Sequence, residues 1–552
     1  MPGSMAGAAI GDGYRDIAAA FERAEERPAP PEDAKLAREL LNDTGNARRL
    51  IARHGLDLVH VEEWGWGAWD GQRWRFDDGD SRAFIRAIET AEAIFDEAEA
   101  LPDFEDDEPP KPATHKQAAG ISAEDLEAWR RWEIWDKRRK RILATKMELK
   151  EFALQSGNRG KAENMLATAA PYLRRRHDEF DDAPYVLNVA NGCLRLDGEQ
   201  VALFDPRRSD RVTKCATVAF DPNAECPRWR QFIDDIFPKQ TDVQVFVQKW
   251  LGYCLTGSIA EQRAVIFEGA GSNGKSVLMN VVSALLGDYA TTTPVETFLH
   301  NDRGKSGSGP SPDIARLVGV RIVRTSEPEP GSRLSESVLK QYTGGEKMVA
   351  RRLHKDFFEF TPAGKLTMSV NIRPVIVGKD HGIKRRLLVV PFRRIFTKDE
   401  ILELDQARGM PLHDWLMAEG PGILNWLLDG FRLWREDGLA EPELVRQQTE
   451  AYFAEMDPIG QFVREACLTI ADGAGVGEAS MEKAVDLYAA YKRWCDGNNE
   501  EPKNNTAFGR RLNDLGIRSA KVGGVGFRTG VSLRPDWRAA AAAGKGSAGD
   551  DE

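Results

Sequence analysis

The sequence predicts an α/β fold, and three apolar segments carry that prediction. Residues 264–267, 320–323 and 364–371 each have the length and apolar content of a buried strand. The first segment runs into a glycine-rich stretch and then an amphipathic helical pattern, the second is followed by Glu327, and the third ends in Asn371. Strands that alternate with helical segments are typical of α/β domains.

Length and composition narrow the class of protein. A chain of 552 residues exceeds what one core accommodates, so we expect about three or four domains. No run of about 18 apolar residues and no amino-terminal signal pattern is present, so we expect a cytoplasmic protein with no membrane partner. The net charge of -11 argues against a broadly basic surface, so any contact with nucleic acid must be local.

The amino-terminal part predicts a loose leader followed by an α+β domain. Residues 1–32 are rich in Ala, Gly and Pro, and residues 33–215 form the predicted domain. Within it, residues 58–76 and 185–204 alternate apolar and polar positions around hairpin turn signals, at Asp70-Gly71 in the first case. Residues 101–117 are acidic and proline-rich, which predicts a surface loop.

A long helix should follow that loop, with Ser122 as its N-cap. Three tryptophans on it, Trp129, Trp132 and Trp135, are expected to pack. The basic run at residues 138–141 has two interpretations, a solvated helix face or a contact with nucleic acid, and the first is favoured because charge runs are common on exposed helices. Residues 216–261 then predict a helical collar with an apolar stripe over 229–237.

The motif that best indicates a chemical function begins at Gly269, which is followed by four residues and then by Gly274, Lys275 and Ser276. This G-x-x-x-x-G-K-S pattern is typical of a phosphate-binding loop when a strand precedes it and a helix follows it, as here. Backbone N–H groups and the helix N-terminus surround the phosphates, the lysine neutralises their charge, and the serine hydroxyl binds Mg²⁺. The predicted ATP-binding residues are Gly269, Ala270, Gly271, Ser272, Asn273, Gly274, Lys275 and Ser276.

Four further polar residues fit the hydrolysis of Mg²⁺-bound ATP. Glu327 follows the strand candidate at 320–323 and is assigned to the metal and the attacking water, with Glu329 as its partner or substitute. Asn371 ends the third strand candidate and is assigned to the γ-phosphate or the water. Arg386 precedes another apolar strand and is assigned to a neighbouring subunit's nucleotide, with a surface ion pair as the alternative.

This order of motifs resembles the superfamily 3 helicases, and in particular the poxvirus-type branch that includes phage and plasmid primase-helicases. The phrases that carry the resemblance are "NVANGCLRL", "WLGYCLTGSIAEQ", "GAGSNGKSVLMNVVSALLGDYA", residues 316–376 and "KRRLLVVPF". The resemblance implies an AAA+-like P-loop ATPase domain over residues 262–436. It also implies a homo-hexameric ring that translocates on single-stranded or forked DNA, together with a separate primase or other replication proteins, in the cytoplasm of a bacterium that carries the phage or mobile element.

The resemblance also implies the DNA contacts. Residues 344–357 fall where the family has a hairpin in the ring channel, and the implied phosphate contacts are Lys347, Arg351, Arg352, His354 and Lys355. Many relatives carry an amino-terminal primase domain, which requires paired carboxylates for two metals. Residues 1–200 offer no clear pair, so we predict no primer synthesis by this chain.

The remaining chain predicts a winged-helix-like domain over residues 437–538 and a disordered tail over 539–552. Two helical segments and a glycine-turned hairpin indicate the winged-helix-like domain. A packing module is an alternative that the sequence favours equally. Its candidate DNA contacts are Arg510, Arg511, Lys521 and Arg528. The leading hypothesis is therefore a replicative DNA helicase that uses Mg²⁺-ATP. The alternatives are an initiator that uses ATP as a switch for assembly, and a helicase-loading ATPase without unwinding activity.

Overall fold

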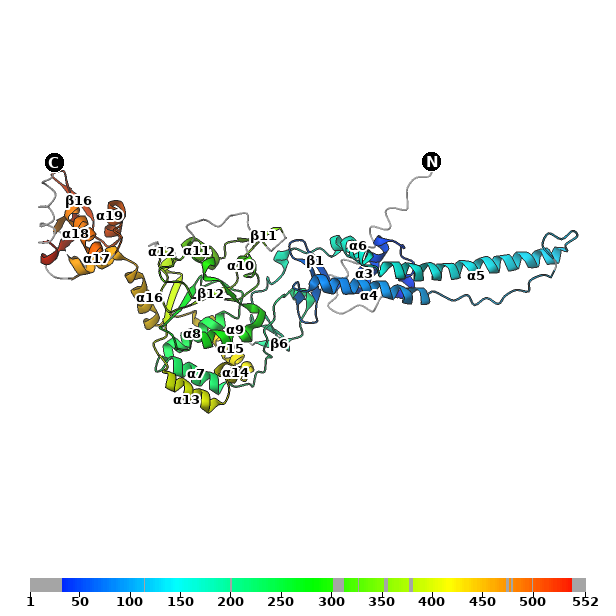
Figure 1. Ribbon diagram of the computed structural model, residues 1–552, viewed down its shortest axis with the longest axis horizontal. Helices are drawn as coiled ribbons and strands as arrows, with labels where there is room; N and C mark the ends of the chain where they lie inside the picture. The colour runs from blue at the N-terminus through cyan, green and yellow to red at the C-terminus, as the bar shows by residue number, and fades with distance from the viewer. Residues whose placement is uncertain are drawn as a thin grey trace.

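The computed structural model describes residues 32–113, 115–198, 201–300, 312–325, 327–351, 356–376, 381–472, 476–477, 480–498 and 500–538. The molecule is elongated, with an α/β body in the middle, a helical arm on one side and a small C-terminal unit on the other (Figure 1). Residues 1–31 of the predicted leader 1–32 and the whole predicted tail 539–552 lie outside the described residues.

The body is built on a five-stranded sheet in the order β13-β7-β12-β9-β8. All four pairings are parallel. The strands are β7 (Ala264–Glu268), β8 (Ala290–Thr293), β9 (Ile322–Thr325), β12 (Lys365–Val370) and β13 (Leu387–Pro391). The predicted α/β class is therefore confirmed at the level of a parallel sheet with helices on both faces.

Alternate residues of the strands enter two different cores. Val265 and Phe267 of β7 point into one core, whereas Ala264 and Ile266 belong to the other. In β13 the same division separates Leu388 and Val390 from Leu387 and Val389. Because successive side chains of a strand point to opposite faces, apolar residues at every position bury the sheet on both sides.

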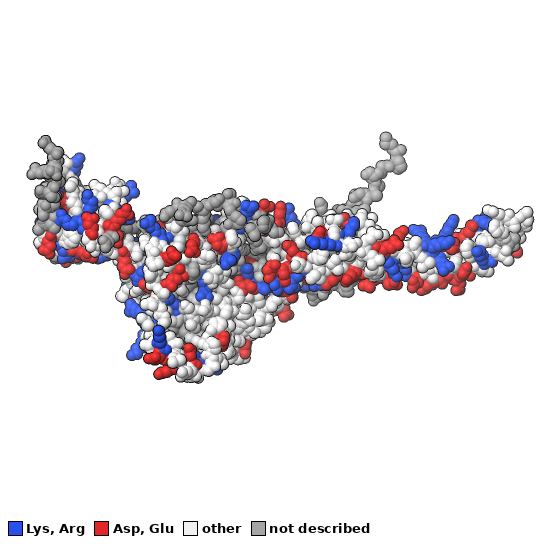
Figure 2. Space-filling model, viewed as in Figure 1, with Lys and Arg blue, Asp and Glu red and all other residues white. Residues whose placement is uncertain are grey.

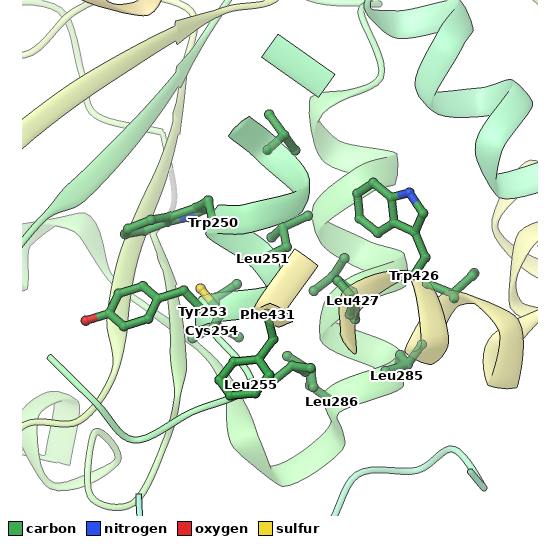
Figure 3. Packing of buried hydrophobic residues seen from close by; sticks show 14 of the residues in the cluster. Trp250, Leu251, Tyr253, Cys254, Leu255, Leu285, Leu286, Trp426, Leu427 and Phe431 are labelled. Atoms are coloured by element: carbon green, nitrogen blue, oxygen red, sulfur yellow. The ribbon is translucent and has the colours of Figure 1, made fainter. Parts of the chain in front are cut away.

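One face is covered by α7 (Pro227–Ile236), α8 (Thr241–Tyr253), α9 (Lys275–Leu286) and α15 (Gly420–Asp437). Side chains of α8, α9 and α15 interdigitate there, as Trp250, Leu285 and Phe431 illustrate (Figure 3). Helices α8 and α15 approach so closely that a Cβ on Gly430 would lie 2.1 Å from the carbonyl oxygen of Gln248, and one on Gly252 would lie 2.2 Å from the backbone nitrogen of Phe431. This crossing requires glycine in both helices.

The opposite face is covered by α11 (Glu336–Gly344), α16 (Glu443–Glu455) and a hairpin. The hairpin pairs β10 (Met348–Arg351) with β11 (Phe357–Phe360) in antiparallel register. Tyr342 of α11 and Tyr452 of α16 are fully buried in this core. The hairpin lies at the place that the resemblance implied.

A single core joins segments that the sequence analysis assigned to different domains. Its members run from Val186 to Val445, so Trp229 of the predicted collar and Leu187 of the predicted N-terminal domain share it with the sheet. The predicted apolar stripe of α7 is confirmed, since Trp229, Phe232, Ile233, Ile236 and Phe237 are all buried. The divisions drawn at 215/216 and 261/262 do not correspond to separate cores.

The N-terminal unit contains helices around a three-stranded antiparallel sheet, β1 (Leu58–Val61), β2 (Gly65–Trp69) and β3 (Trp74–Arg75). The turn predicted at Asp70-Gly71 spans four residues rather than two, because the Asp70 carboxylate accepts hydrogen bonds from the backbone N–H groups of Gln72 and Arg73. A second antiparallel sheet has the order β4-β5-β6. The other elements are α2 (Asp33–Leu36), α3 (Asp43–His54), α6 (Arg159–Ala169), β4 (Val186–Val189), β5 (Gly192–Arg195) and β6 (Ala202–Phe204).

The arm consists of α4 (Gly79–Glu99) and α5 (Ala123–Ser156), whose 34 residues span about 50 Å at the usual rise. Ser122 caps α5 as predicted, by accepting a hydrogen bond from the backbone N–H of Asp125. The predicted loop at 101–117 lies along α5, where the Trp135 indole donates to the carbonyl oxygen of Asp106 and Lys111 stacks on Trp132. Lys or Arg and Asp or Glu are interspersed over the arm (Figure 2), which favours the solvated interpretation of residues 138–141.

The C-terminal unit has a core of its own. Helices α18 (Ala484–Gly497) and α19 (Asn505–Asp514) and the hairpin of β16 (Ser519–Val522) and β17 (Val525–Thr529) are present as predicted. The unit also contains α17 (Pro458–Ala466), β14 (Cys467–Thr469), β15 (Met481–Lys483) and β18 (Val531–Leu533).

The body further contains α10 (Pro312–Ala315), α12 (His381–Lys384), α13 (Lys398–Arg408) and α14 (Leu412–Met417).

Two buried cations hold the amino-terminal edge of the sheet. The Arg321 guanidinium donates to the carbonyl oxygens of Leu255 and Val186 and stacks 4.5 Å from the centre of the Tyr289 ring. Lys365, the first residue of β12, donates from Nζ to the carbonyl oxygens of Thr256 and Ala363. Burial lowers the pKa of Lys365 to about 7.

The glycine crossing predicts a large effect of one methyl group. Gly430→Ala should destabilise the protein by about 1–3 kcal/mol, because the new Cβ collides with backbone that has no room to move. The matched control is Gly160→Ala in α6, where no atom lies within 4 Å of an added Cβ. The control should be neutral or slightly stabilising. Equal melting temperatures for the two variants would contradict the close approach of α8 and α15.

The low pKa of Lys365 predicts a pH dependence of stability. Between pH 7 and pH 10.5 the unfolded chain binds a proton that the folded chain has lost, so stability rises with pH across this window. Lys365→Met should remove this rise, which is at most about 1.4 kcal/mol per pH unit. Calorimetric melting at pH 7 and pH 9.5 measures it, with the exposed Lys398→Met as control. Parallel pH profiles for wild type and Lys365→Met would refute the assignment.

Candidate functional site

The candidate site lies at the carboxyl end of β7, where residues 269–274 form a tight loop that leads into α9. Gly271 and Gly274 have φ angles of 95° and 85°, and Ser272 has a φ of 45°. We call residues 269–274 the glycine loop. Its backbone is anchored at Gly269, which donates to the carbonyl oxygen of Val370, and at Ser272, whose carbonyl oxygen accepts from the backbone N–H of Phe396.

At two positions of the loop, Gly269 and Gly274, neighbouring atoms leave no room for a side chain. A Cβ on Gly269 would lie 2.2 Å from the Asn273 side-chain nitrogen and 2.6 Å from the carbonyl oxygen of Phe392. A Cβ on Gly274 would lie 2.4 Å from a methyl carbon of Ile236. The buried Nδ2 of Asn273 has no hydrogen-bond acceptor among the described residues. The loop therefore fits a ligand that is held by backbone N–H groups and brings its own acceptors.

Lys275 connects the loop to the two neighbouring strands. Its Nζ donates to the carbonyl oxygen of Gly269 and to Asn371 Oδ1, the latter at 3.1 Å. The Asn371 amide in turn donates to Glu327 at 3.0 Å, and the backbone N–H of Asn371 donates to the other carboxylate oxygen at 2.7 Å. The ends of β7, β12 and β9 are thus joined by one chain of polar contacts through Lys275, Asn371 and Glu327.

The Lys275 ammonium is poised to receive an anion. The residue is 4% exposed, and burial lowers the pKa of Lys275, while the carboxylates of Glu327 and Glu268 oppose that shift. The present acceptors are a neutral carbonyl and a neutral amide, so a negatively charged group at this position would compensate the charge better.

The other predicted ligands surround this contact. Ser276 lies in the first turn of α9 with an exposed side chain, and Ala270 is exposed at the loop surface. Glu329 is exposed, two residues beyond Glu327, and is not part of the Lys275–Asn371–Glu327 chain. Within the described residues, no cluster of three His, Cys, Asp or Glu residues suited to a metal ion is found.

An ion-pair network beside the loop was missed by the sequence analysis. Glu268, the last residue of β7, pairs with Arg373 through contacts of 2.5 and 2.9 Å, and it also accepts from the Gln448 amide at 2.9 Å. Arg373 also pairs with Glu455 at the end of α16 and stacks on Tyr452. Arg373 lies two residues after Asn371 at a strand end, which was the available signal.

Arg386 is at the far edge of the sheet from Lys275. It precedes β13, and its carbonyl oxygen accepts from the backbone N–H of Ala264, the first residue of β7, whereas the glycine loop follows the last residue of β7. The length of the strand puts about 15 Å between these two edges. The guanidinium donates to the carbonyl oxygen of Gly382 at 2.9 Å. The structure does not bring Arg386 together with Lys275, Glu327 and Asn371 of the same chain.

The predicted DNA contacts of the hairpin are only partly described. Lys347 is exposed and 3.6 Å from Glu359, and the Arg351 guanidinium stacks on the Phe357 ring at 5.0 Å. Arg352, His354 and Lys355 lie outside the described residues. The base of the hairpin contacts the N-terminal unit, where His177 is 2.7 Å from the carbonyl oxygen of Glu359.

The basic residues of the C-terminal unit differ in their availability. Arg510 and Lys521 are exposed. Arg511 instead pairs with Asp457 at 2.6 Å, and Arg528 donates to Asn513 at 2.7 Å. Arg511 is therefore engaged within the protein rather than presented as a free DNA contact.

The fold and the strand-end contacts define an α/β protein with a loop-and-helix site at one edge of a parallel sheet. Comparison with known families adds that residues 47–238 match the family described as D5 N terminal like. A protein of Acanthamoeba polyphaga mimivirus named "Putative helicase" is 30% identical over 334 residues, which cover 58% of this chain and 34% of that protein.

Other relatives carry related names. A "Putative helicase" of Frog virus 3 is 26% identical and covers 48% of this chain and 28% of its own length. A "Putative primase" of African swine fever virus is 25% identical and covers 38% of this chain and 22% of its own length. Among solved structures, an apo structure of the NrS-1 C-terminal region aligns with 57% of this chain and 77% of that one, at 14% identity and a TM-score of 0.37.

The chain is similar to viral proteins named as helicases and primases, and its match to the D5 N terminal like family over residues 47–238 agrees with the predicted resemblance to primase-helicases. It spans about a third or less of the length of the curated relatives described above. These relatives come from viruses of eukaryotes, so the expectation of a bacterial phage or plasmid origin is not supported by them. Across the described residues, no helix is both long enough and apolar enough to cross a membrane.

The Glu268–Arg373 pair predicts an energetic coupling. The two side chains are 17% and 14% exposed, so Arg373→Met should lower the unfolding free energy by about 2 kcal/mol because it leaves a half-buried carboxylate without its cation. Glu268→Gln with Arg373→Met should recover part of this loss. A double-mutant cycle measures the coupling, and the exposed Arg159–Glu163 pair is the reference, expected to show a much weaker coupling because solvent screens it. Equal couplings for the two pairs would contradict a structural role for Arg373.

Proposed function

We propose that this chain is an ATP-dependent DNA motor of a replication system, a helicase that translocates on single-stranded DNA. The observation that carries the proposal is the polar chain from Lys275 through Asn371 to Glu327, beside a glycine loop that has no room for a side chain at Gly269 or Gly274. This combination places a cation, an amide and a carboxylate around a backbone cradle, which is the set that phosphoryl transfer to water requires.

The residues present fit a metal-bound nucleoside triphosphate. The N–H groups of the glycine loop and of the first turn of α9 would hold the phosphates, and Lys275 would exchange its two neutral acceptors for phosphate oxygens. Ser276, with Glu327 and with Glu329 as its partner or substitute, would hold Mg²⁺. When bound, the magnesium triphosphate supplies the cleavable phosphoanhydride and part of the charge neutralisation.

The residues of this chain would act by orienting the Glu327 carboxylate and the attacking water. Asn371 holds the Glu327 carboxylate in place through two hydrogen bonds, one to each of its oxygens. A carboxylate held in this way orients the attacking water and accepts its hydrogen bond. Arg386 is too far from its own loop to act there, which favours the interpretation that it completes the site of a neighbouring subunit in a homo-hexamer.

DNA contact is assigned to the hairpin of β10 and β11. The phosphate contacts in a ring channel would come from Lys347 and Arg351 of the described part and from Arg352, His354 and Lys355. Such a local group of basic residues explains how a chain with an acidic net charge would bind DNA. We retain the expectation that this chain does not synthesise primers and works beside a separate primase. The ATP-switched initiator and the helicase loader stay as alternatives, because both would use the same nucleotide site.

Two substitutions and one assay separate these possibilities. Lys275→Ala should reduce ATP hydrolysis at least 100-fold because it removes the cation, whereas Glu327→Gln should keep ATP affinity within a few-fold and reduce hydrolysis to a similar extent. Both should fail to unwind a forked duplex. Arg393→Gln, on the exposed segment after β13, is the control and should leave both activities unchanged.

The outcomes distinguish the proposal from its alternatives. Hydrolysis that Lys275→Ala leaves intact would remove the nucleotide assignment. Wild-type protein that hydrolyses ATP but displaces no strand at any salt concentration would favour the initiator or the loader.

A further inference from the structure

A basic cavity separates the α/β body from the C-terminal unit. It has a volume of about 480 Å³ and lies beside α16, the helix that leads from the sheet to the C-terminal unit (Figure 1). Lys384 and Arg385 contribute from the body, and Arg464 and Arg511 contribute from the C-terminal unit. We call this cavity the junction pocket. It is distinct from the glycine loop, which does not contribute to its lining.

The lining of the junction pocket holds more cations than anions. Six Lys or Arg residues and three carboxylates line it. Each carboxylate is already held by an arginine, and the three pairs are Glu441 with Arg263 at 2.5 Å, Glu450 with Arg446 at 3.4 Å and Asp457 with Arg511 at 2.6 Å. Within the described residues, Lys384, Arg385 and Arg464 have no carboxylate partner. Three cations from both walls are therefore available to an anion.

The lining selects for phosphate groups rather than for bases. Leu387 and Leu388 are buried beneath the pocket and offer no exposed flat surface. The ring of Phe453 is approached by the Lys384 ammonium at 5.7 Å, so its face is occupied by a cation. A site for a free nucleotide would be expected to provide a platform or hydrogen bonds for the base, whereas a strand is gripped through its phosphates. The visible face of the molecule carries mixed charges (Figure 2), which makes such a local concentration of cations distinctive.

We propose that the junction pocket binds phosphates of a DNA strand and thereby fastens the C-terminal unit to the body. This inference rests on the proposed DNA motor. The strand would contact Lys384 and Arg385 on one side and Arg464 on the other, so one ligand would bridge both walls. The junction pocket lies apart from the channel hairpin and would be a second DNA-binding position on the same chain.

The test removes one cation from each wall. Lys384→Gln with Arg464→Gln alters two exposed side chains, so folding should be preserved, which the melting temperature checks. Binding of a fluorescein-labelled 20-nucleotide thymidylate is measured by anisotropy between 50 and 250 mM salt. We expect roughly tenfold weaker binding at 100 mM salt and a salt slope shallower by roughly 1.4, because each phosphate that a cation neutralises on a single strand contributes about 0.7 to the slope.

The matched control is Arg393→Gln with Lys398→Gln, which removes the same charge from exposed positions outside the junction pocket. It should bind within about twofold of wild type. ATP hydrolysis without DNA should be unchanged in both double variants, because neither alters the glycine loop, Asn371 or Glu327.

The binding measurements distinguish a failure of the proposed function from a failure of the junction-pocket proposal. Wild-type protein that does not bind the thymidylate would refute the proposed function itself. If wild type binds and the Lys384 and Arg464 variant matches it in affinity and slope, the junction pocket does not bind DNA. A fluorescent ADP analogue tested on Lys275→Ala protein probes the other source of phosphate. Binding there that the junction substitutions abolish would assign the pocket to a free nucleotide and overturn the proposal.

Discussion

The position of β12 between β7 and β9 is the constraint on which the site depends. Val370 of β12 is aligned with Glu268 of β7, and Met368 is aligned with Thr325 of β9, so the residues that follow all three strands emerge at one edge. Gly269, Asn371 and Glu327 meet there, although together they span about a hundred residues of the chain. Parallel pairing thus turns distant sequence positions into one polar contact chain, and Lys275 at the start of α9 closes it.

The sequence predicted the local features of this region well, because they follow from short-range rules. The strand, glycine loop and helix around Lys275 could be recognised from spacing and apolar pattern, and so could the strand ends at Glu327 and Asn371. Arg373 was missed because its role comes from partners on β7 and α16, which only the tertiary arrangement brings close. The four-residue turn at 70–73 differs from prediction because an aspartate side chain satisfies two backbone donors. The merger of the predicted collar into the body depended on α8 meeting α15, which lies about 170 residues further along the chain.

The two edges of the sheet have different electrostatic character. At the carboxyl edge the buried Lys275 and the exposed Glu327 are joined by hydrogen bonds through Asn371. At the amino edge Arg321 and Lys365 are buried against backbone carbonyl groups, which fixes β9 and β12 to the segment after α8. One edge is therefore rigid while the other keeps exchangeable contacts. The junction pocket and Arg386 lie toward the amino edge of the sheet. Any movement of α16 and the C-terminal unit would therefore be a movement relative to the edge that Arg321 and Lys365 hold.

The crossing of α8 and α15 has a consequence for how this architecture tolerates sequence drift. Where side chains meet, a larger residue in one helix can be offset by a smaller one in the other, so many pairs are acceptable. At Gly252 and Gly430 the backbones themselves meet, and no exchange on the opposite helix creates space. Any homologue with a bulkier residue at either point must hold these helices further apart. In such a homologue the layer of helices beneath the sheet would be thicker. The distance between the helices equivalent to α8 and α15 could therefore be used to classify relatives whose sequences have diverged.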